Sequence, residues 1–173
     1  MKSKAENPDA GLKRQGAKNR HLRADAQRNV ETLLKAALEV FGTSGVDAPV
    51  REIAEQAGVG IGTVYRHFPK RSDLIAAVFR HEIDACADAA PLLAAEHEPV
   101  EALTRWMQQY AAFIATKRRL APALHSGDPA FESLSAYFLQ RLKPALQMLL
   151  EAAEAAGEIR ADADAKDLLS AIA

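Results

Sequence analysis

Hydrophobic positions recur at helical spacing along most of the chain beyond its first 25 residues. From about Ala26 to Thr43 they follow the order i, i+3, i+4, i+7, i+8 and i+11, which predicts one long amphipathic helix. Its apolar positions are Val30, Leu33, Leu34, Ala37, Leu38 and Phe41. Gly42 and Gly45 bracket the end of this helix, so we expect the chain to turn back there.

Two short helices joined by a glycine turn follow. The first runs from Pro49 to about Gln56 and opens with a proline, whose missing N–H costs nothing at a helix start. Gly58 ends it. The second runs from Ile61 to Phe68, and Pro69 closes it because proline disfavours helical geometry in the preceding residue. This spacing predicts a helix-turn-helix, whose second helix stands clear of the body and fits a major groove.

The second of these helices has an inner and an outer side. With Val64 pointing inward, Ile61 and Phe68 fall within about 60° of it and can hold the helix on its support. Gly62 and Arg66 then point outward. Two hydroxyl-bearing side chains lie at the flanks, where they can reach a phosphate or a base edge: Thr63 and Tyr65.

The stretch GVGIGTVYRHF from Gly58 to Phe68, followed by Lys70, Arg71 and Leu74, resembles the signature of the TetR family of bacterial transcriptional regulators. In that family glycine, threonine, tyrosine and phenylalanine recur at these offsets after a long amphipathic helix. Arg71 stands where lysine is usual, which keeps the charge. The resemblance extends from about residue 23 to residue 173 and is less specific in the second half.

The resemblance implies a homodimer that binds a palindromic operator in double-stranded DNA. Carried over position by position, it implies these DNA-binding residues: Ile61, Gly62, Thr63, Tyr65, Arg66, His67, Lys70 and Arg71. Tyr65 and His67 would bind phosphate, and Gly62 would let the helix approach closely. Lys70 and Arg71 would anchor the next helix to the DNA backbone.

Three of these residues are candidates for contacting the bases themselves. Thr63 and Arg66 are expected to contact bases or phosphates. Ile61 occupies a position that is often polar in the family. It either touches a thymine methyl or packs beneath the helix, and the sequence leaves both readings open.

The remaining elements are also helical. A linking helix is expected with Ser72 as its cap, ending before Pro91. Two longer helices span Pro99 to Leu124 and about Pro129 to Ala156, and Pro144 should kink or break the second. A last helix begins within residues 162–173; it has about a dozen residues, fewer than the family usually has, so we expect an incomplete dimer interface.

The predicted fold class is all-α, with a three-helix DNA-binding head joined by the linking helix to a larger helical ligand-binding and dimerisation domain. We expect a disordered basic extension at residues 1–25, the helix-turn-helix domain at 26–70 and the effector-binding domain at 71–173. The extension is either a solvated tail or an arm that tracks phosphates or enters a minor groove. The side chains that would serve the arm are Lys18, Arg20 and Arg23.

A small apolar or amphipathic effector of unknown identity is implied, and four residues are candidates for binding it. Trp106, Tyr110 and Phe113 form an aromatic stripe that either packs the core or lines the pocket. His125, in the loop HSGDP, is either a pocket residue or an exposed loop histidine.

Basic and acidic residues are unevenly distributed between the two halves of the chain. Residues 1–80 hold 14 Lys and Arg against 9 Asp and Glu, whereas residues 81–173 hold 8 against 14. The basic half contains the helix-turn-helix, which suits a polyanionic partner.

Several classes of protein are disfavoured. The single cysteine, Cys86, cannot form an internal disulfide and is expected to be a small buried hydrophobe. With neither a cleavable signal nor an 18-residue apolar run, we expect a cytoplasmic protein without a membrane partner. No phosphate-binding glycine loop, metal-ligand pattern or nucleophile elbow occurs, so we expect no enzyme, metal or cofactor. Two alternatives remain: a helical ligand-binding dimer without DNA-binding activity, and a small all-α enzyme.

Overall fold

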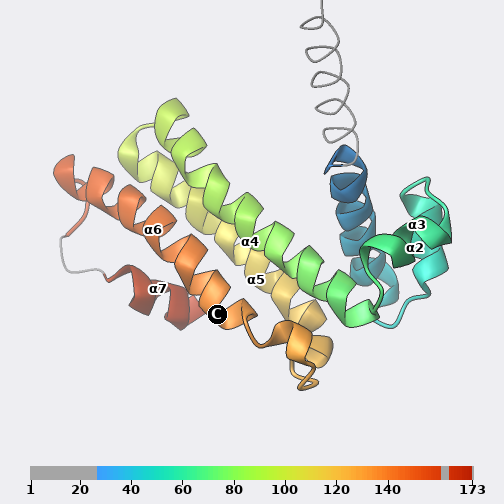
Figure 1. The fold of residues 1–173 in the computed structure, drawn as a ribbon. Coiled ribbons are helices and arrows are strands. Elements are labelled where there is room, and N and C mark those ends of the chain that lie inside the picture. Colours follow the sequence, from blue (N-terminus) through green and yellow to red (C-terminus); the bar gives the residue numbers. More distant parts are fainter. Residues whose placement is uncertain (1–26, 161–163, 173) are drawn as a thin grey trace, which may run out of the picture.

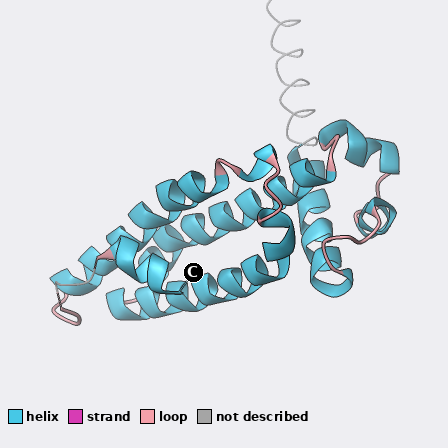
Figure 2. Cartoon of the chain, turned by 90° about the horizontal axis from the view of Figure 1, so that it is seen from below, coloured by secondary structure: helices cyan, strands magenta, loops and turns pink. Residues whose placement is uncertain are grey.

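The computed structural model describes residues 27–160 and 164–172, and all regular structure in these ranges is helical (Figures 1 and 2). The first helix occupies residues 27–44. The elements that follow are α2 (Val50–Gln56), α3 (Ile61–His67), α4 (Arg71–Glu96), α5 (Pro99–Leu124), the 3-10 turn η1 (Pro129–Phe131), α6 (Leu134–Ala155) and α7 (Ala165–Ile172). The all-α prediction is confirmed. The expected basic extension, with Lys18, Arg20 and Arg23, lies outside the described residues.

The first helix, α2 and α3 form a small head at one end of the molecule (Figure 1). Its interior is apolar, because Leu33, Phe41, Ile53 and Val64 are almost completely buried. The chain reverses between the first helix and α2 at Gly45, which has a φ of 84° that glycine adopts without steric cost. The glycine turn predicted between α2 and α3 is present too.

The larger half, here called the body, is built on α4, which packs against α5 and α6 (Figure 1). The predicted cap at Ser72 is wrong, since α4 begins one residue earlier, at Arg71. The backbone N–H of Lys70 donates to the Asp73 carboxylate at 3.0 Å, so Asp73 and not Ser72 satisfies the helix end.

Prolines do not end the long helices. The prediction that the linking helix stops before Pro91 is wrong, because α4 continues through it to Glu96. In the same way α6 runs without a break through Pro144, and α5 contains Pro122. An internal proline costs about 3 kcal/mol through a lost hydrogen bond and a clash. Burial of neighbouring side chains offsets that cost. Ala90, which precedes Pro91, is 0% exposed.

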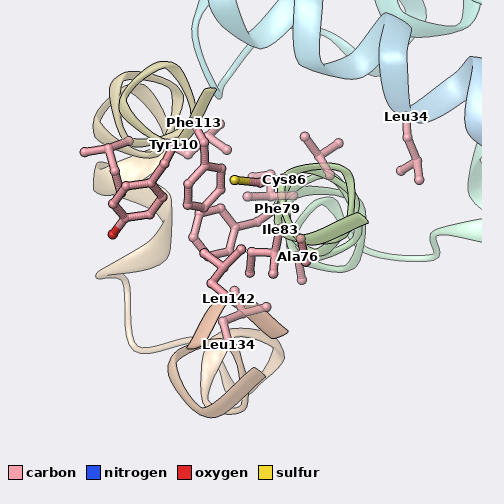
Figure 3. Packing of buried hydrophobic residues seen from close by; sticks show 14 of the residues in the cluster. Leu34, Ala76, Phe79, Ile83, Cys86, Tyr110, Phe113, Leu134 and Leu142 are labelled. Carbon is pink, nitrogen blue, oxygen red and sulfur yellow. The ribbon is translucent and has the colours of Figure 1, made fainter. Parts of the chain in front are cut away.

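Aromatic rings fill the body core (Figure 3). The ring centroids of Phe79 on α4 and Phe113 on α5 lie 5.5 Å apart, and those of Trp106 and Tyr110 lie 5.6 Å apart. Burial raises the pKa of the neighbouring Cys86 thiol to about 12, and the side chain is 5% exposed. The prediction of a buried, unreactive cysteine therefore fits the structure.

An ionic network joins α4 to α6. Arg141 donates from Nε to Asp84 at 2.7 Å and from Nη2 to Asp88 at 2.6 Å. The Tyr137 hydroxyl also donates to Asp84, at 2.7 Å, and this hydrogen bond raises the pKa of Tyr137. The network fixes the middle of α4 against α6.

Candidate functional site

The exposed side of α3 is the first candidate site. Val64 points into the head and is 1% exposed, and Phe68 is half-buried beside it. Gly62 and Arg66 are exposed on the other side, as the helical spacing predicted. Ile61 is 46% exposed, so the structure does not use it as packing beneath the helix.

The backbone at Gly62 is open to a partner. A Cβ added at this position would have no heavy atom within 4 Å, so nothing in the protein itself requires glycine there. Thr63, which is half-buried, donates its backbone N–H to the Gly60 carbonyl at 2.8 Å. Tyr65 is 50% exposed at the flank. Together these residues present a narrow helix that a groove can receive.

Basic side chains extend this surface toward α4. His67 and Lys70 are exposed, whereas Arg71 is half-buried. Arg71 donates from Nη1 to the Val46 carbonyl at 2.6 Å, which ties the first residue of α4 to the loop after the first helix. A guanidinium carries five N–H donors, so this bond leaves donors on Arg71 for a phosphate.

The second candidate site is a cavity of about 380 Å³ in the body, bordered by α4, α5, η1, α6 and α7. Its apolar wall consists of Phe79, Leu124, Phe131, Leu134, Phe138 and Leu139. Four polar side chains also line it: Lys117, His125, Ser135 and Ser170. A cavity with apolar walls and a few polar groups is typical of small-molecule sites.

Of the four side chains predicted to bind a ligand, only His125 lines this cavity. Trp106 and Tyr110 are 0% exposed, and Phe113 is 4% exposed in the core. Trp106 donates from Nε1 to the Cys86 carbonyl at 2.8 Å, and the Tyr110 hydroxyl donates to the Leu169 carbonyl at 2.7 Å. Their polar atoms thus have partners within the protein.

Sequence reasoning missed Phe131 and Phe138 as cavity residues. Both belong to the apolar stripe of the sequence after Pro129, which is broader than one neighbouring helix requires. That extra width was the available signal, because a side chain left over from helix packing can border a cavity.

One of the two ring nitrogens of His125 already has a hydrogen-bond partner within the protein. Its Nδ1 lies 2.8 Å from the Ala121 carbonyl, an acceptor, so Nδ1 carries a hydrogen and Nε2 of the neutral ring is left as an acceptor. His125 itself is exposed at the end of α5. It can therefore hydrogen-bond a ligand at the open side of the cavity.

The segment after α5 links the cavity to the start of α4. Hydrogen bonds from the Ala130 amide and the Ser72 hydroxyl, with Lys70 nearby, hold the pKa of Asp128 below its usual value. The Ala130 amide donates to Asp128 at 2.9 Å. Residues on one short segment therefore border the cavity and contact α4 beside Arg71.

Metal sites and membrane-spanning helices are absent from the described residues. Within residues 27–160 and 164–172, no three His, Cys, Asp or Glu side chains gather closely enough to hold a metal ion. No helix in the described part of the chain has the length and apolar character needed to cross a membrane.

Both halves of the chain match families of known regulators. Residues 33–78 match the family described as bacterial regulatory proteins, tetR family. Residues 98–173 match the SbtR-like transcriptional regulator C-terminal domain. Over 64 residues the chain is 36% identical to an HTH-type transcriptional regulator of Staphylococcus aureus. That match covers 36% of this chain and 35% of the relative, so the chain spans about a third of the length of the curated relatives it matches.

Two solved structures are similar over most of their length. A TetR transcriptional regulator from Streptomyces coelicolor is 38% identical with a TM-score of 0.72, and the match covers 82% of this chain and 81% of that one. A TetR transcription regulatory protein from Mycobacterium vanbaalenii is 37% identical with a TM-score of 0.73, covering 87% and 90%. With the outward-facing α3 and these matches across head and body, the chain belongs to the TetR family of bacterial transcriptional regulators, which are DNA-binding helix-turn-helix proteins rather than enzymes.

Proposed function

We propose that this protein is a repressor that binds a palindromic operator as a homodimer and is released from it by a small-molecule effector. The observation that carries the proposal is the outer side of α3, where Gly62 has open space and Arg66 is exposed. We assign DNA binding to residues 26–70 and effector binding with dimerisation to residues 71–173.

Phosphate contacts would position the head on the duplex. The Tyr65 hydroxyl and the His67 ring lie on the exposed part of α3 and would bind one strand. Lys70 and Arg71, at the start of α4, would bind the backbone beside it. Thr63 and Arg66 would reach bases or phosphates, depending on how deeply α3 enters the groove.

Ile61 would read a thymine methyl. Four large hydrophobic side chains are exposed in the described chain, and two of them, Ile61 and Tyr65, lie one turn apart on α3. The C5-methyl group of thymine is the apolar feature of the major groove, and the first turn of a recognition helix is the part that contacts base edges. A β-branched side chain presents its methyl groups in few rotamers, which reduces the entropy lost on contact.

The dimer interface would lie on the last two helices, α6 and α7, as the family resemblance suggests. Met148 on α6 is 38% exposed, which is consistent with a partner on that side. Two recognition helices about 34 Å apart, or a modest multiple of that, would then enter successive major grooves.

The effector would bind the body cavity and act through α4. Phe79 of α4 lines the cavity, and Arg71, two turns earlier, is bonded to the head through Val46. These positions are about 12 Å apart along the helix. A ligand that displaces Phe79 would therefore change the tilt of α4, provided that it binds the two arrangements unequally.

The proposal is tested by selecting bound duplexes from a random DNA pool and measuring affinity for the selected operator by fluorescence anisotropy. A Tyr65→Phe plus Arg71→Ala variant should bind at least about tenfold more weakly, because two phosphate contacts are lost. Arg105→Ala is the matched charge control, since Arg105 is exposed on α5 and pairs with Glu101. If the double variant binds as well as the unmodified protein, the head does not bind DNA in this way and the regulator proposal fails.

Two further measurements complete the test. Sedimentation analysis should give a dimer whose operator shows two related half-sites; a monomer on a single half-site contradicts the dimer. Operator thymines are replaced by deoxyuridine one at a time. Binding should weaken at one position per half-site, and the Ile61→Ala variant should bind the thymine and uracil duplexes equally at that position. Equal binding of both duplexes would refute the methyl contact without affecting the rest of the proposal.

A further inference from the structure

A second cavity lies between the head and the body, and is called the junction cavity here. Its volume is about 440 Å³, and its lining comes from the end of the first helix and the last turns of α5. Phe41 and Leu120, which are 2% and 1% exposed, supply much of its apolar surface. No described residue lines both this cavity and the body cavity, so a ligand in one does not occupy the other.

One positive and one negative side chain also line the junction cavity. The Arg119 Nη1 lies only 3.3 Å from where a Cβ on Gly42 would be, so the guanidinium group rests against the end of the first helix. Within the described part of the chain Arg119 makes no hydrogen bond or ion pair. The Glu39 Oε2 accepts a hydrogen bond from the Gln56 Nε2 at 2.7 Å, but this neutral donor leaves the carboxylate charge uncompensated.

The two charges select among ligand classes. A ligand that carries only a positive charge would meet Arg119, and one that carries only a negative charge would meet Glu39, so each would face one like charge. A strongly polar ligand such as a sugar would leave hydroxyl groups unpaired against Phe41 and Leu120. A zwitterion with an apolar side chain matches both charges and the apolar surface.

Two hydroxyl groups in the lining favour an ammonium group over further carboxylates. Thr43 donates to the Glu39 carbonyl at 3.1 Å, and Thr116 donates to the Ala112 carbonyl at 3.3 Å. Because each hydroxyl hydrogen is used within its own helix, the oxygens are left as acceptors, which an ammonium group can satisfy.

The volume of the junction cavity limits the ligand as well. At about 30 Å³ for each water-sized group, about 440 Å³ holds roughly 15 non-hydrogen atoms. An α-amino acid with an aromatic side chain is of this size, and its ring can pack on the ring of Phe41.

We propose that the junction cavity is a second ligand site, which binds a small zwitterion with a large apolar side chain, such as an aromatic α-amino acid. The carboxylate of the ligand pairs with Arg119, its ammonium group with Glu39, and its side chain with Phe41 and Leu120. Because this ligand contacts the first helix and α5 at once, it ties the head to the body. The site depends neither on the effector role of the body cavity nor on DNA binding.

The test compares phenylalanine with two analogues that each lack one charge. Phenylalanine, phenethylamine and phenylpropanoate are titrated by calorimetry into the full chain without DNA. Phenylalanine should bind about fivefold or more tightly than either analogue, because each analogue loses one charged hydrogen bond. Arg119→Gln should remove only the preference over phenethylamine, which lacks the carboxylate. Glu39→Gln should remove only the preference over phenylpropanoate, which lacks the ammonium group.

Arg118→Gln and Glu31→Gln are the matched controls. They remove the same charges from the same two helices at exposed positions outside the lining, and should leave both preferences intact. Thermal unfolding of each variant shows whether it is folded. The proposal is overturned if phenylalanine does not bind, if it binds no more tightly than both analogues, or if a preference survives the matching substitution.

Discussion

Gly62 separates the requirements of the fold from those of DNA binding. Gly62→Ala adds a methyl group where no heavy atom of the protein lies within 4 Å, so the unbound protein has no clash to relieve. Glycine inside a helix is about 0.8–1 kcal/mol less favourable than alanine. Because Gly62 is the second residue of the seven-residue α3, we expect about half of that gain. The free energy of unfolding should therefore rise by about 0.5 kcal/mol.

On the operator the same methyl group should be unfavourable. If the α3 backbone approaches the bases as closely as proposed, the added carbon occupies space that the duplex needs. A tenfold loss of affinity corresponds to about 1.4 kcal/mol, which is a modest estimate for one misplaced methyl group in a tight contact. The variant should thus be slightly more stable and bind its operator at least about tenfold more weakly.

Two assays measure these opposite effects. Thermal unfolding of the free protein should show a midpoint higher by about 1–2 °C for a chain of this size. Fluorescence anisotropy should show weaker operator binding, with a much smaller loss on non-operator DNA, where contacts are mainly to phosphates. Unchanged operator affinity together with raised stability would show that the backbone at Gly62 does not approach the duplex, and the proposed docking would be wrong.

Three predictions concern the body. Because burial raises the pKa of Cys86 to about 12, the native protein should not react with an aromatic disulfide reagent at pH ~8, whereas the unfolded chain should; rapid native reaction would refute this. Burial also raises the pKa of Tyr110 to about 12. The stability that the neutral phenol contributes is therefore complete below about pH 10 and is lost as pH rises toward about 12. The phenolate absorbance of Tyr110, identified by its loss in the Tyr110→Phe variant, should appear only as the pH approaches about 12. Trp106→Phe leaves the Cys86 carbonyl without its 2.8 Å donor and should lower the unfolding free energy by about 2 kcal/mol, measured by urea denaturation; no change would refute that role.

Helix positions followed from local signals. The glycine at 58 and the prolines at 49, 69 and 99 mark the ends of α2, α3 and α5 to within about a residue. Apolar spacing gave the buried side of α3 correctly at Val64. These features depend on the steric and hydrogen-bonding needs of a few consecutive residues, so one sequence contains them.

Features that depend on tertiary packing were predicted less well. Proline rules placed the end of the linking helix before Pro91, but burial of Ala90 against the body keeps α4 helical beyond it. The sequence did not show whether the aromatic stripe containing Trp106 packs in the core or lines the cavity, because the angles at which the helices cross decide this. The Trp106 Nε1 donates to a carbonyl of α4 in the core, and the cavity is lined by other residues of α4, α5, η1, α6 and α7.

The arrangement of α4 is consistent with the proposed control of α3 by a ligand in the body cavity. Arg141 holds α4 to α6 at Asp84, and Arg71 holds its first residue to the head. Phe79, which lines the cavity, lies between these two attachments. About 20 Å of helix separates Asp84 from Arg71, so a tilt of about 5° around the Asp84 attachment would move Arg71 by about 2 Å. In a symmetric dimer both heads would move, and a change of up to about 4 Å in half-site spacing is enough to misplace α3 in a groove about 12 Å wide.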